Sequence, residues 1–137
     1  MIRYLLNTSA FSDLMNDRRG VAERAALERS RGNQVGLCTI VQAELIDGIE
    51  NSDDPEEQMK LFKRIRANYR CWPFDSKATY VFGKIKTVLR RRNQLTDDAD
   101  LMIASISLVL SSCIVVARDA HFSRVPGLVV ENWATSY

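Results

Sequence analysis

Histidine and cysteine are scarce in this chain, which has one histidine and three cysteines among 137 residues. The cysteines are Cys38, Cys71 and Cys113, and they form no Cys-x-x-Cys pair. We therefore expect buried free thiols rather than a disulfide framework or a redox motif. A zinc site made of histidine and cysteine is not expected either. Any metal here should be a hard cation held by oxygen atoms.

Long apolar runs are also absent. No run approaches the ~18 residues that a membrane-spanning helix needs, and the apolar stretch near the first residue is too short for a secretory signal. We therefore expect no membrane partner and a cytoplasmic location. The length suits one domain, residues 1–137.

Short apolar runs alternate with helical patterns along the chain, and this order is typical of an α/β domain with a mainly parallel central sheet flanked by helices. Strands are predicted at 2–6, 34–38, 113–116 and 128–130, with an extended piece at 70–74. Helices are predicted from Thr8 or Ser9, at 21–29, 40–50 and 55–68, after Asp75 or Ser76, and at 101–110. The last of these is apolar nearly all round, which predicts a central, buried helix.

Several predicted strands lead to an acid or an amide. Asn7 follows the first strand, Glu44 lies in the helix after the second, and Asp119 comes shortly after the strand at 113–116. Asp100 opens the apolar helix. The carboxyl ends of parallel strands meet at one edge of a sheet, and clustered carboxylates repel one another unless a cation lies among them. We therefore predict a divalent-metal site formed by these four residues.

Taken singly, each of these side chains has an ordinary explanation as a solvent-facing helix residue, a first-turn acid, a turn former or a helix cap. Only their joint placement favours a site. Asp97 is either a further ligand or the cap of the apolar helix, and we favour the cap. We expect His121 to pack beside Phe122 rather than act as a general acid. Trp72 and Trp133 are expected to pack in the core or at its edge rather than stack on bases.

Basic residues gather in two runs, Lys60 to Arg70 and Lys84 to Arg92. Solvated helix faces are the ordinary explanation for such runs. Beside an acidic metal site, they would also offset the charge of a phosphodiester substrate.

Five segments carry a resemblance to a known family. In chain order they are YLLNTS at 4–9, AELIDGI at 43–49, DLMIA at 100–104, VARDAHF at 116–122 and VPGLVVENW at 125–133. They resemble, respectively, a strand ending in Asp-Thr-Asn or Asp-Thr-Ser, a Glu-Leu-x-x-Gly segment, Asp-x-x-Ile-Ala, Thr-x-Asp-x-x-Phe and the usual family ending. The family is that of PIN-domain ribonucleases, specifically the VapC-like toxins of type II toxin–antitoxin modules.

This resemblance implies a metal-dependent endoribonuclease that uses Mg²⁺ or Mn²⁺. It implies that Asn7, Glu44, Asp100 and Asp119 are the catalytic and metal-binding residues, with Thr8, Ser9 and Asp97 in support. It also implies a homodimer, a cognate VapB-like antitoxin and an RNA substrate, often a tRNA or another structured RNA. Arg118, together with the basic runs, is our candidate for contact with RNA phosphates, and a solvated loop charge is the alternative.

Asn7 departs from the family pattern, in which an Asp stands at this point. An amide offers a metal one carbonyl oxygen and no charge, so we expect this chain to bind metal poorly and to cleave RNA slowly or not at all. A deliberate inactivation and a natural loss both fit. The rival interpretation is a catalytically inert PIN-fold module that binds RNA or an antitoxin. A phosphoacceptor receiver domain is disfavoured, because Val116 is followed by Ala-Arg-Asp without the lysine that such domains need.

Overall fold

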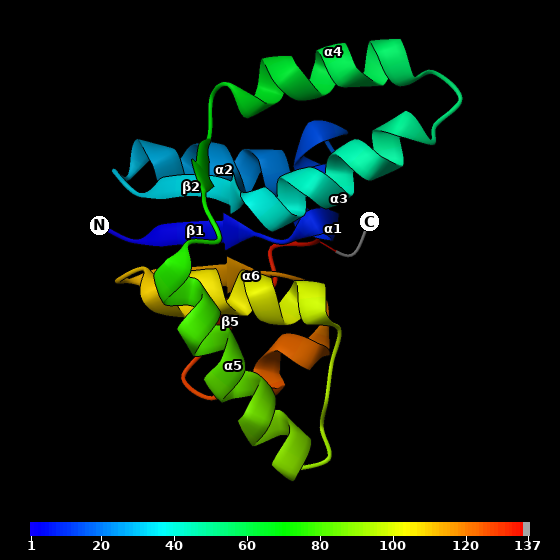
Figure 1. Cartoon of the computed structure of the whole chain (residues 1–137). Coiled ribbons are helices and arrows are strands. Elements are labelled where there is room, and N and C mark those ends of the chain that lie inside the picture. Colours follow the sequence, from blue (N-terminus) through cyan, green and yellow to red (C-terminus); the bar gives the residue numbers. More distant parts are fainter. Residues whose placement is uncertain (136–137) are drawn as a thin grey trace.

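The computed structural model describes residues 1–135 and contains one five-stranded sheet in which every pairing is parallel. The strand order is β3-β2-β1-β4-β5. The strands are β1 (Arg3–Leu6), β2 (Gln34–Cys38), β3 (Arg70–Trp72), β4 (Cys113–Val116) and β5 (Val130–Glu131). The predicted α/β class with a parallel central sheet is confirmed (Figure 1).

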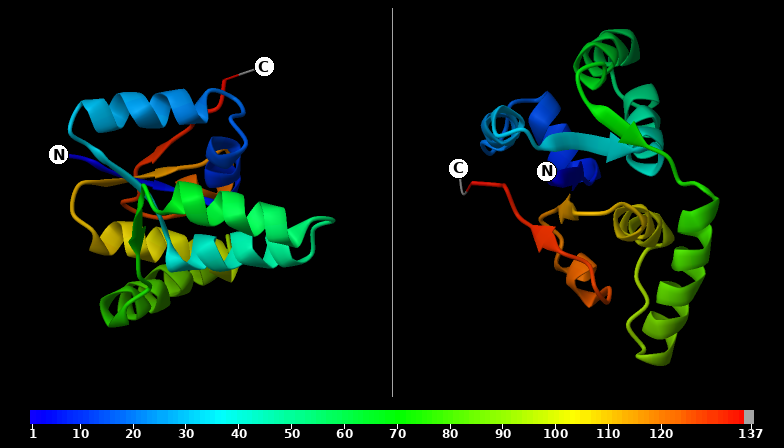
Figure 2. Two further views of the ribbon diagram at one scale, coloured as in Figure 1. Left: turned by 90° about the horizontal axis from the view of Figure 1, so that it is seen from above. Right: turned by 90° about the vertical axis from the view of Figure 1, so that its left-hand side faces the viewer.

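Helices cover both faces of the sheet. They are α1 (Thr8–Met15), α2 (Val21–Ser30), α3 (Thr39–Glu50), α4 (Pro55–Arg66), α5 (Ser76–Arg91) and α6 (Asp98–Val109), and a short 3-10 helix, η1, spans Ala120–Arg124. Both views in Figure 2 place α2 on one side of the sheet and α6 with α5 on the other. The α3–α4 hairpin projects beyond the sheet, and α5 is the outermost helix of the opposite half (Figure 1).

The core lies between the central strands and the helices that cover them. Leu5, Leu6 and Val115 are fully buried in β1 and β4, as expected for strands covered on both faces. Helix α6 buries Leu101, Ile103 and four further residues, so the prediction of a central helix is confirmed. Within residues 1–135, no helix combines the length and apolar character that crossing a bilayer requires.

Some details differ from the sequence-based expectations. Asn7, rather than Thr8 or Ser9, caps α1, because its side-chain oxygen accepts a hydrogen bond from the amide of Ala10. The last strand is β5 at Val130–Glu131 rather than at 128–130, since only these residues pair with β4.

The buried tryptophans and the free cysteines agree with expectation. Trp72 and Trp133 are both buried. All three cysteines are free, with Cys38 buried and Cys71 and Cys113 half-buried.

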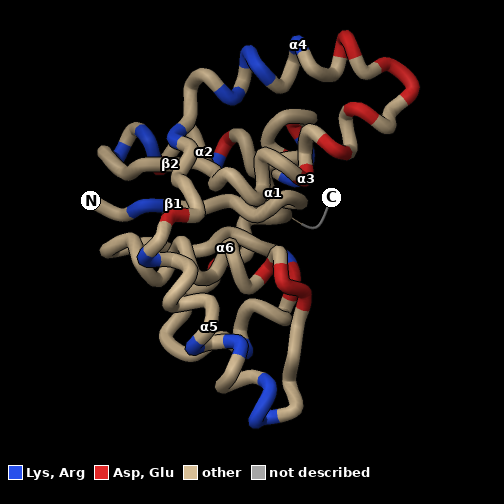
Figure 3. Tube along the Cα trace, in the orientation of Figure 1, with Lys and Arg blue, Asp and Glu red and all other residues tan. Residues whose placement is uncertain are grey.

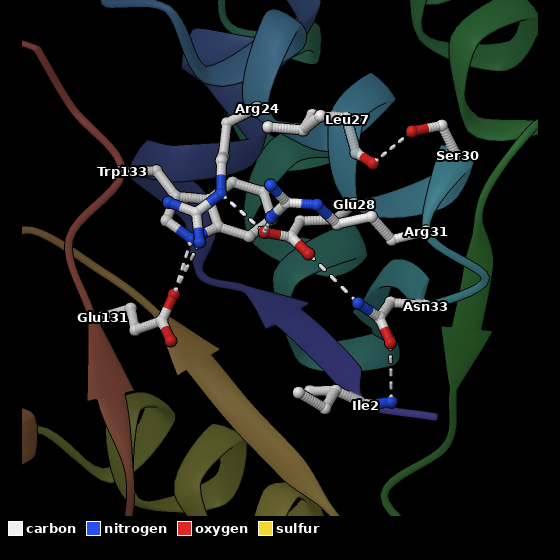
Figure 4. Close-up of polar contacts among 9 residues, drawn as sticks. All are labelled: Ile2, Arg24, Leu27, Glu28, Ser30, Arg31, Asn33, Glu131 and Trp133. Carbon is white, nitrogen blue, oxygen red and sulfur yellow. Dashed lines mark hydrogen bonds and ion pairs between the residues drawn. The ribbon is translucent and has the colours of Figure 1, made fainter.

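A buried carboxylate ties α2 to the rest of the fold. Glu28 accepts hydrogen bonds from Arg24 at 2.7 Å, Arg31 at 3.3 Å and Asn33 at 3.0 Å (Figure 4). Burial alone would raise the pKa of Glu28, but the hydrogen bonds from Arg24 and Asn33 outweigh it and lower the pKa. Arg24 also pairs with Glu131 of β5 at 3.2 Å, so α2 is linked to the far edge of the sheet.

Candidate active site

The first position of the predicted site lies at the carboxyl end of β1. The strands β2, β1 and β4 are adjacent and parallel, so their carboxyl ends meet at one edge of the sheet. The backbone amide of Asn7 donates to the carbonyl oxygen of Val116 at 3.0 Å. Its side-chain oxygen caps α1 through Ala10 at 2.9 Å. Asn7 is buried, and its side-chain carbonyl oxygen is engaged by the first turn of α1.

Glu44 reaches the same edge from α3, the helix that directly follows β2. Its carboxylate accepts a hydrogen bond from the hydroxyl of Thr8, the residue after Asn7. This contact joins the first turn of α1 to the middle of α3. The sequence analysis expected Thr8 to support position 7, and its hydroxyl instead reaches Glu44. Ser9 is exposed and lies beside the same contact, in the lining of a cleft described below.

Asp100 lies in the first turn of α6 and is the most perturbed acid of the site. Burial raises the pKa of its carboxyl, and the negative charges of Asp97, Asp119 and Glu44 raise it further, to about 6; the charge of His121 acts in the opposite direction. The structure therefore brings Glu44, Asp100 and Asp119 into one electrostatic neighbourhood. Asp97 joins them while it caps α6, because its carboxylate accepts from the amide of Ala99 at 2.9 Å.

Asp119 and His121 form a small unit after β4. The Asp119 carboxylate caps the short helix η1, since it accepts from the amide of His121 at 2.8 Å. The ring nitrogen Nδ1 of His121 lies 3.3 Å from the same oxygen atom. Phe122 is buried, whereas the His121 side chain is 52% exposed. The packing of His121 beside Phe122 stays a prediction.

The donor set fits a hard cation in chemistry and charge, although it does not form a closed cage. The candidate donors are carboxylate and amide oxygens, which Mg²⁺ and Mn²⁺ prefer. Burial is the largest cause of the raised pKa of Asp100, and the negative charges of Asp97, Asp119 and Glu44 add to it. Among residues 1–135, no three Asp, Glu, His or Cys side chains converge closely enough to enclose an ion as they stand. The acids can influence the pKa of Asp100 without forming a cage, because carboxylates repel over longer distances than a metal–ligand bond spans.

Arg118 is held by a buried acid that the sequence analysis missed. Asp13 of α1 is 3% exposed; its carboxylate pairs with Arg19 at 2.9 Å and with Arg118 at 3.4 Å. The signal was available, because Asp13 falls three residues after Ala10 and so lies on the apolar face of α1. A charge on such a face needs a partner.

A cleft of about 560 Å³ begins at Thr8 and Glu44 and runs between α1 and α3. Asp13 and three arginines, Arg18, Arg19 and Arg118, lie in its lining. The cleft therefore joins the acidic edge to a group of cations.

Comparisons with known proteins identify the family of the chain. Residues 4–128 match the model of the PIN domain family. "Ribonuclease VapC1" of Methanocaldococcus jannaschii is 30% identical over 124 residues, which is 90% of this chain and 81% of that protein. The "tRNA(fMet)-specific endonuclease VapC" of Salmonella typhimurium is 26% identical over 134 residues, 97% of this chain and 99% of that protein.

The structure of VapBC2 from Rickettsia felis, bound to a DNA fragment from its promoter, contains a similar chain. Its TM-score is 0.89 at 25% identity, with 96% of this chain and 99% of that chain covered. The chain described here therefore belongs to the PIN-domain family, within the group of VapC ribonucleases.

Proposed function

We propose that this protein is a metal-dependent endoribonuclease toxin of a toxin–antitoxin pair, and that Asn7 leaves this chain inactive or strongly impaired. The observation that carries the proposal is the raised pKa of Asp100, caused by burial and by three neighbouring carboxylates at the acidic edge of the sheet. Structural acids are usually paired with cations, whereas catalytic ones are held in strained electrostatic surroundings.

The cation would be Mg²⁺ or Mn²⁺, held by Glu44, Asp100 and Asp119 together with the residue at position 7. Such an ion, when bound, activates a water molecule and offsets negative charge on the phosphate. Thr8 fixes the Glu44 carboxylate through its hydroxyl. Arg118, which forms an ion pair with Asp13 at 3.4 Å, lines the adjoining cleft, where a phosphate of the RNA would meet a cation.

Substrate and partners are proposed from the relatives. The Salmonella typhimurium protein is named as specific for tRNA(fMet), and we infer that a structured RNA such as a tRNA is the substrate here. The Rickettsia felis structure contains a VapBC2 complex, and we infer a VapB-like antitoxin for this chain. A homodimeric toxin is proposed from the family resemblance alone.

The alternative is an inert PIN-fold module that binds RNA or an antitoxin without turnover. Asn7 favours it, because an amide at this position removes one negative charge from the site, and its carbonyl oxygen is engaged by Ala10.

The deciding experiment restores the acid with Asn7→Asp and measures cleavage of labelled tRNA with Mg²⁺, with Mn²⁺ and with EDTA. The proposal expects cleavage by Asn7→Asp that EDTA abolishes and that the double variant Asn7→Asp/Asp100→Asn lacks. The double variant is the matched control, since it carries the same formal charge as the given chain. If Asn7→Asp is as inactive as the given chain, the binding module is the better explanation.

A further inference from the structure

One face of α5 is cationic in a way that the stability of the helix does not explain. No acidic residue occurs between Ser76 and Arg91, and five of these residues are Lys or Arg. Lys77, Lys84 and Arg91 are exposed and seven residues apart, so they follow one stripe along the helix. Within residues 1–135 none of the three forms an ion pair, whereas Lys86, on another face, pairs with Asp98 at 2.9 Å.

The position of Lys77 is unfavourable for the helix itself. It lies in the first turn of α5, where the helix dipole places partial positive charge and a cation is disfavoured. Lys84 has Tyr80 and Val88 at the positions four residues away, so it has no acid to pair with along the helix. Arg91, in the last turn, does complement the dipole. Two of the three cations therefore contribute nothing evident to folding.

Tyr80 lies on the same stripe and is 74% exposed, more than any other large hydrophobic residue within residues 1–135. It falls between Lys77 and Lys84 on the helical spacing. An aromatic ring between unpaired cations is the combination that binds single-stranded or looped nucleic acid, because the cations meet phosphates and the ring stacks on a base.

The place of α5 in the fold suits such a contact. The helix packs on α6 and stands at the outside of the molecule (Figures 1 and 2). Figure 3 shows Lys and Arg along α5 and Asp and Glu at the neighbouring start of α6, which is where Asp100 lies. The Lys86–Asp98 pair joins the two helices there. The cationic stripe therefore flanks the acidic edge without belonging to it.

We propose that this stripe, formed by Lys77, Tyr80, Lys84 and Arg91, is a secondary RNA-binding surface that holds a part of the substrate away from the scissile bond. The proposal rests on the proposed function, since it takes RNA as the substrate. Lys77 and Arg91 are fourteen residues apart, which corresponds to about 21 Å along the helix axis. The stripe is exposed and contains none of the residues of the candidate site, so we expect it to contact a part of the RNA outside the cleavage point.

The test measures RNA binding by the given chain in EDTA, so that cleavage is not needed for the result. Fluorescence anisotropy compares the chain with Lys77→Gln/Lys84→Gln, using a labelled RNA hairpin and a labelled tetranucleotide. The matched control is Arg29→Gln/Arg31→Gln, which removes the same charge from exposed positions at the end of α2, outside both basic runs. Each phosphate contact contributes about 0.7 to the slope of log affinity against log salt. When salt is raised from about 50 to 200 mM, the loss of affinity should therefore be roughly sevenfold smaller for the stripe variant, which lacks two contacts, than for the given chain.

Tyr80→Ala should weaken hairpin binding roughly tenfold at fixed salt, as expected for the loss of one stacked base. Neither stripe variant should change binding of the tetranucleotide. Equal losses in the control and stripe variants would overturn the proposal, because they would reflect net charge alone.

The proposal would also be overturned if RNA binding is unchanged and Tyr80→Ala has a lower mass than the given chain in light scattering. That result would assign the stripe to a protein interface. Failure of this proposal can be distinguished from failure of the proposed function. A chain that binds RNA through α5 but stays inactive as Asn7→Asp would support the stripe and refute the nuclease.

Discussion

Asp100 provides the sharpest quantitative prediction, because its charge is costly to the folded state. Its pKa is about 6 in the structure and 3.8 in a model compound. A rise of about two in pKa corresponds to about 3 kcal/mol between the two protonation states. The carboxyl remains partly exposed, so solvent screening reduces the cost to about 1–2 kcal/mol.

The sign follows from proton linkage. Between the two pKa values the folded state binds more protons than the unfolded state, so the contribution of Asp100 to stability decreases as the pH rises through this window. Below about pH 4 the group is protonated in both states and costs nothing. Above about pH 6 the full cost is present. Asp100→Asn imitates the neutral form and should remove the cost.

We therefore expect Asp100→Asn to stabilise the protein by about 1–2 kcal/mol at pH 7.5 and by little at pH 4. Urea unfolding followed by circular dichroism at both pH values measures this difference. Asp53→Asn is the matched control, since Asp53 is exposed in the turn between α3 and α4, and it should change stability little at either pH. An Asp100→Asn variant that is less stable than the parent at pH 7.5 would refute the reasoning, because burial and the neighbouring carboxylates would then not make the charge of Asp100 costly.

Variants at three further positions test other parts of the structure. Asn7→Ala should cost about 1 kcal/mol through loss of the α1 cap, whereas Asn7→Asp should keep the cap, and thermal unfolding compares the two. Gly36→Ala should destabilise by about 1–3 kcal/mol or displace β3, since an added Cβ would lie 2.4 Å from the carbonyl oxygen of Arg70; urea unfolding and crystallography of the variant check this. Glu28→Ala should cost about 1–3 kcal/mol at neutral pH, because Arg24 and Asn33 lose the buried carboxylate that accepts their hydrogen bonds. The cost should shrink as the pH falls through the lowered pKa of Glu28, and a cost that does not depend on pH would contradict this.

The sequence predicted the framework of the site because the relevant signals are local. Apolar runs identified the strands β1, β2 and β4, and parallel order places their carboxyl ends at one edge. The cap of α6 at Asp97 was also predictable, since an acid before an apolar helical pattern is a common start signal.

Other features depend on contacts between distant segments and were not predictable in the same way. The pairing of Asp13 with Arg118 joins α1 to the loop after β4, more than a hundred residues later. The exposure of His121 depends on the turn of η1, which holds Asp119 and His121 together through a side-chain cap. The double use of Asn7 was missed because its capping role and its place in the site were treated as alternatives.

Asn7 connects the stability of this chain to its proposed loss of activity. An Asp at this position would cap α1 equally well and would gain from the helix dipole. It would also add a negative charge at the sheet edge where Glu44, Asp100 and Asp119 gather, and this should raise the pKa of Asp100 beyond its present value of about 6. The amide relieves that repulsion, and the same loss of charge weakens the attraction for a cation. A chain with Asn7 should therefore depend less on Mg²⁺ for its stability than a chain with Asp at this position, because less unbalanced charge remains for the ion to neutralise.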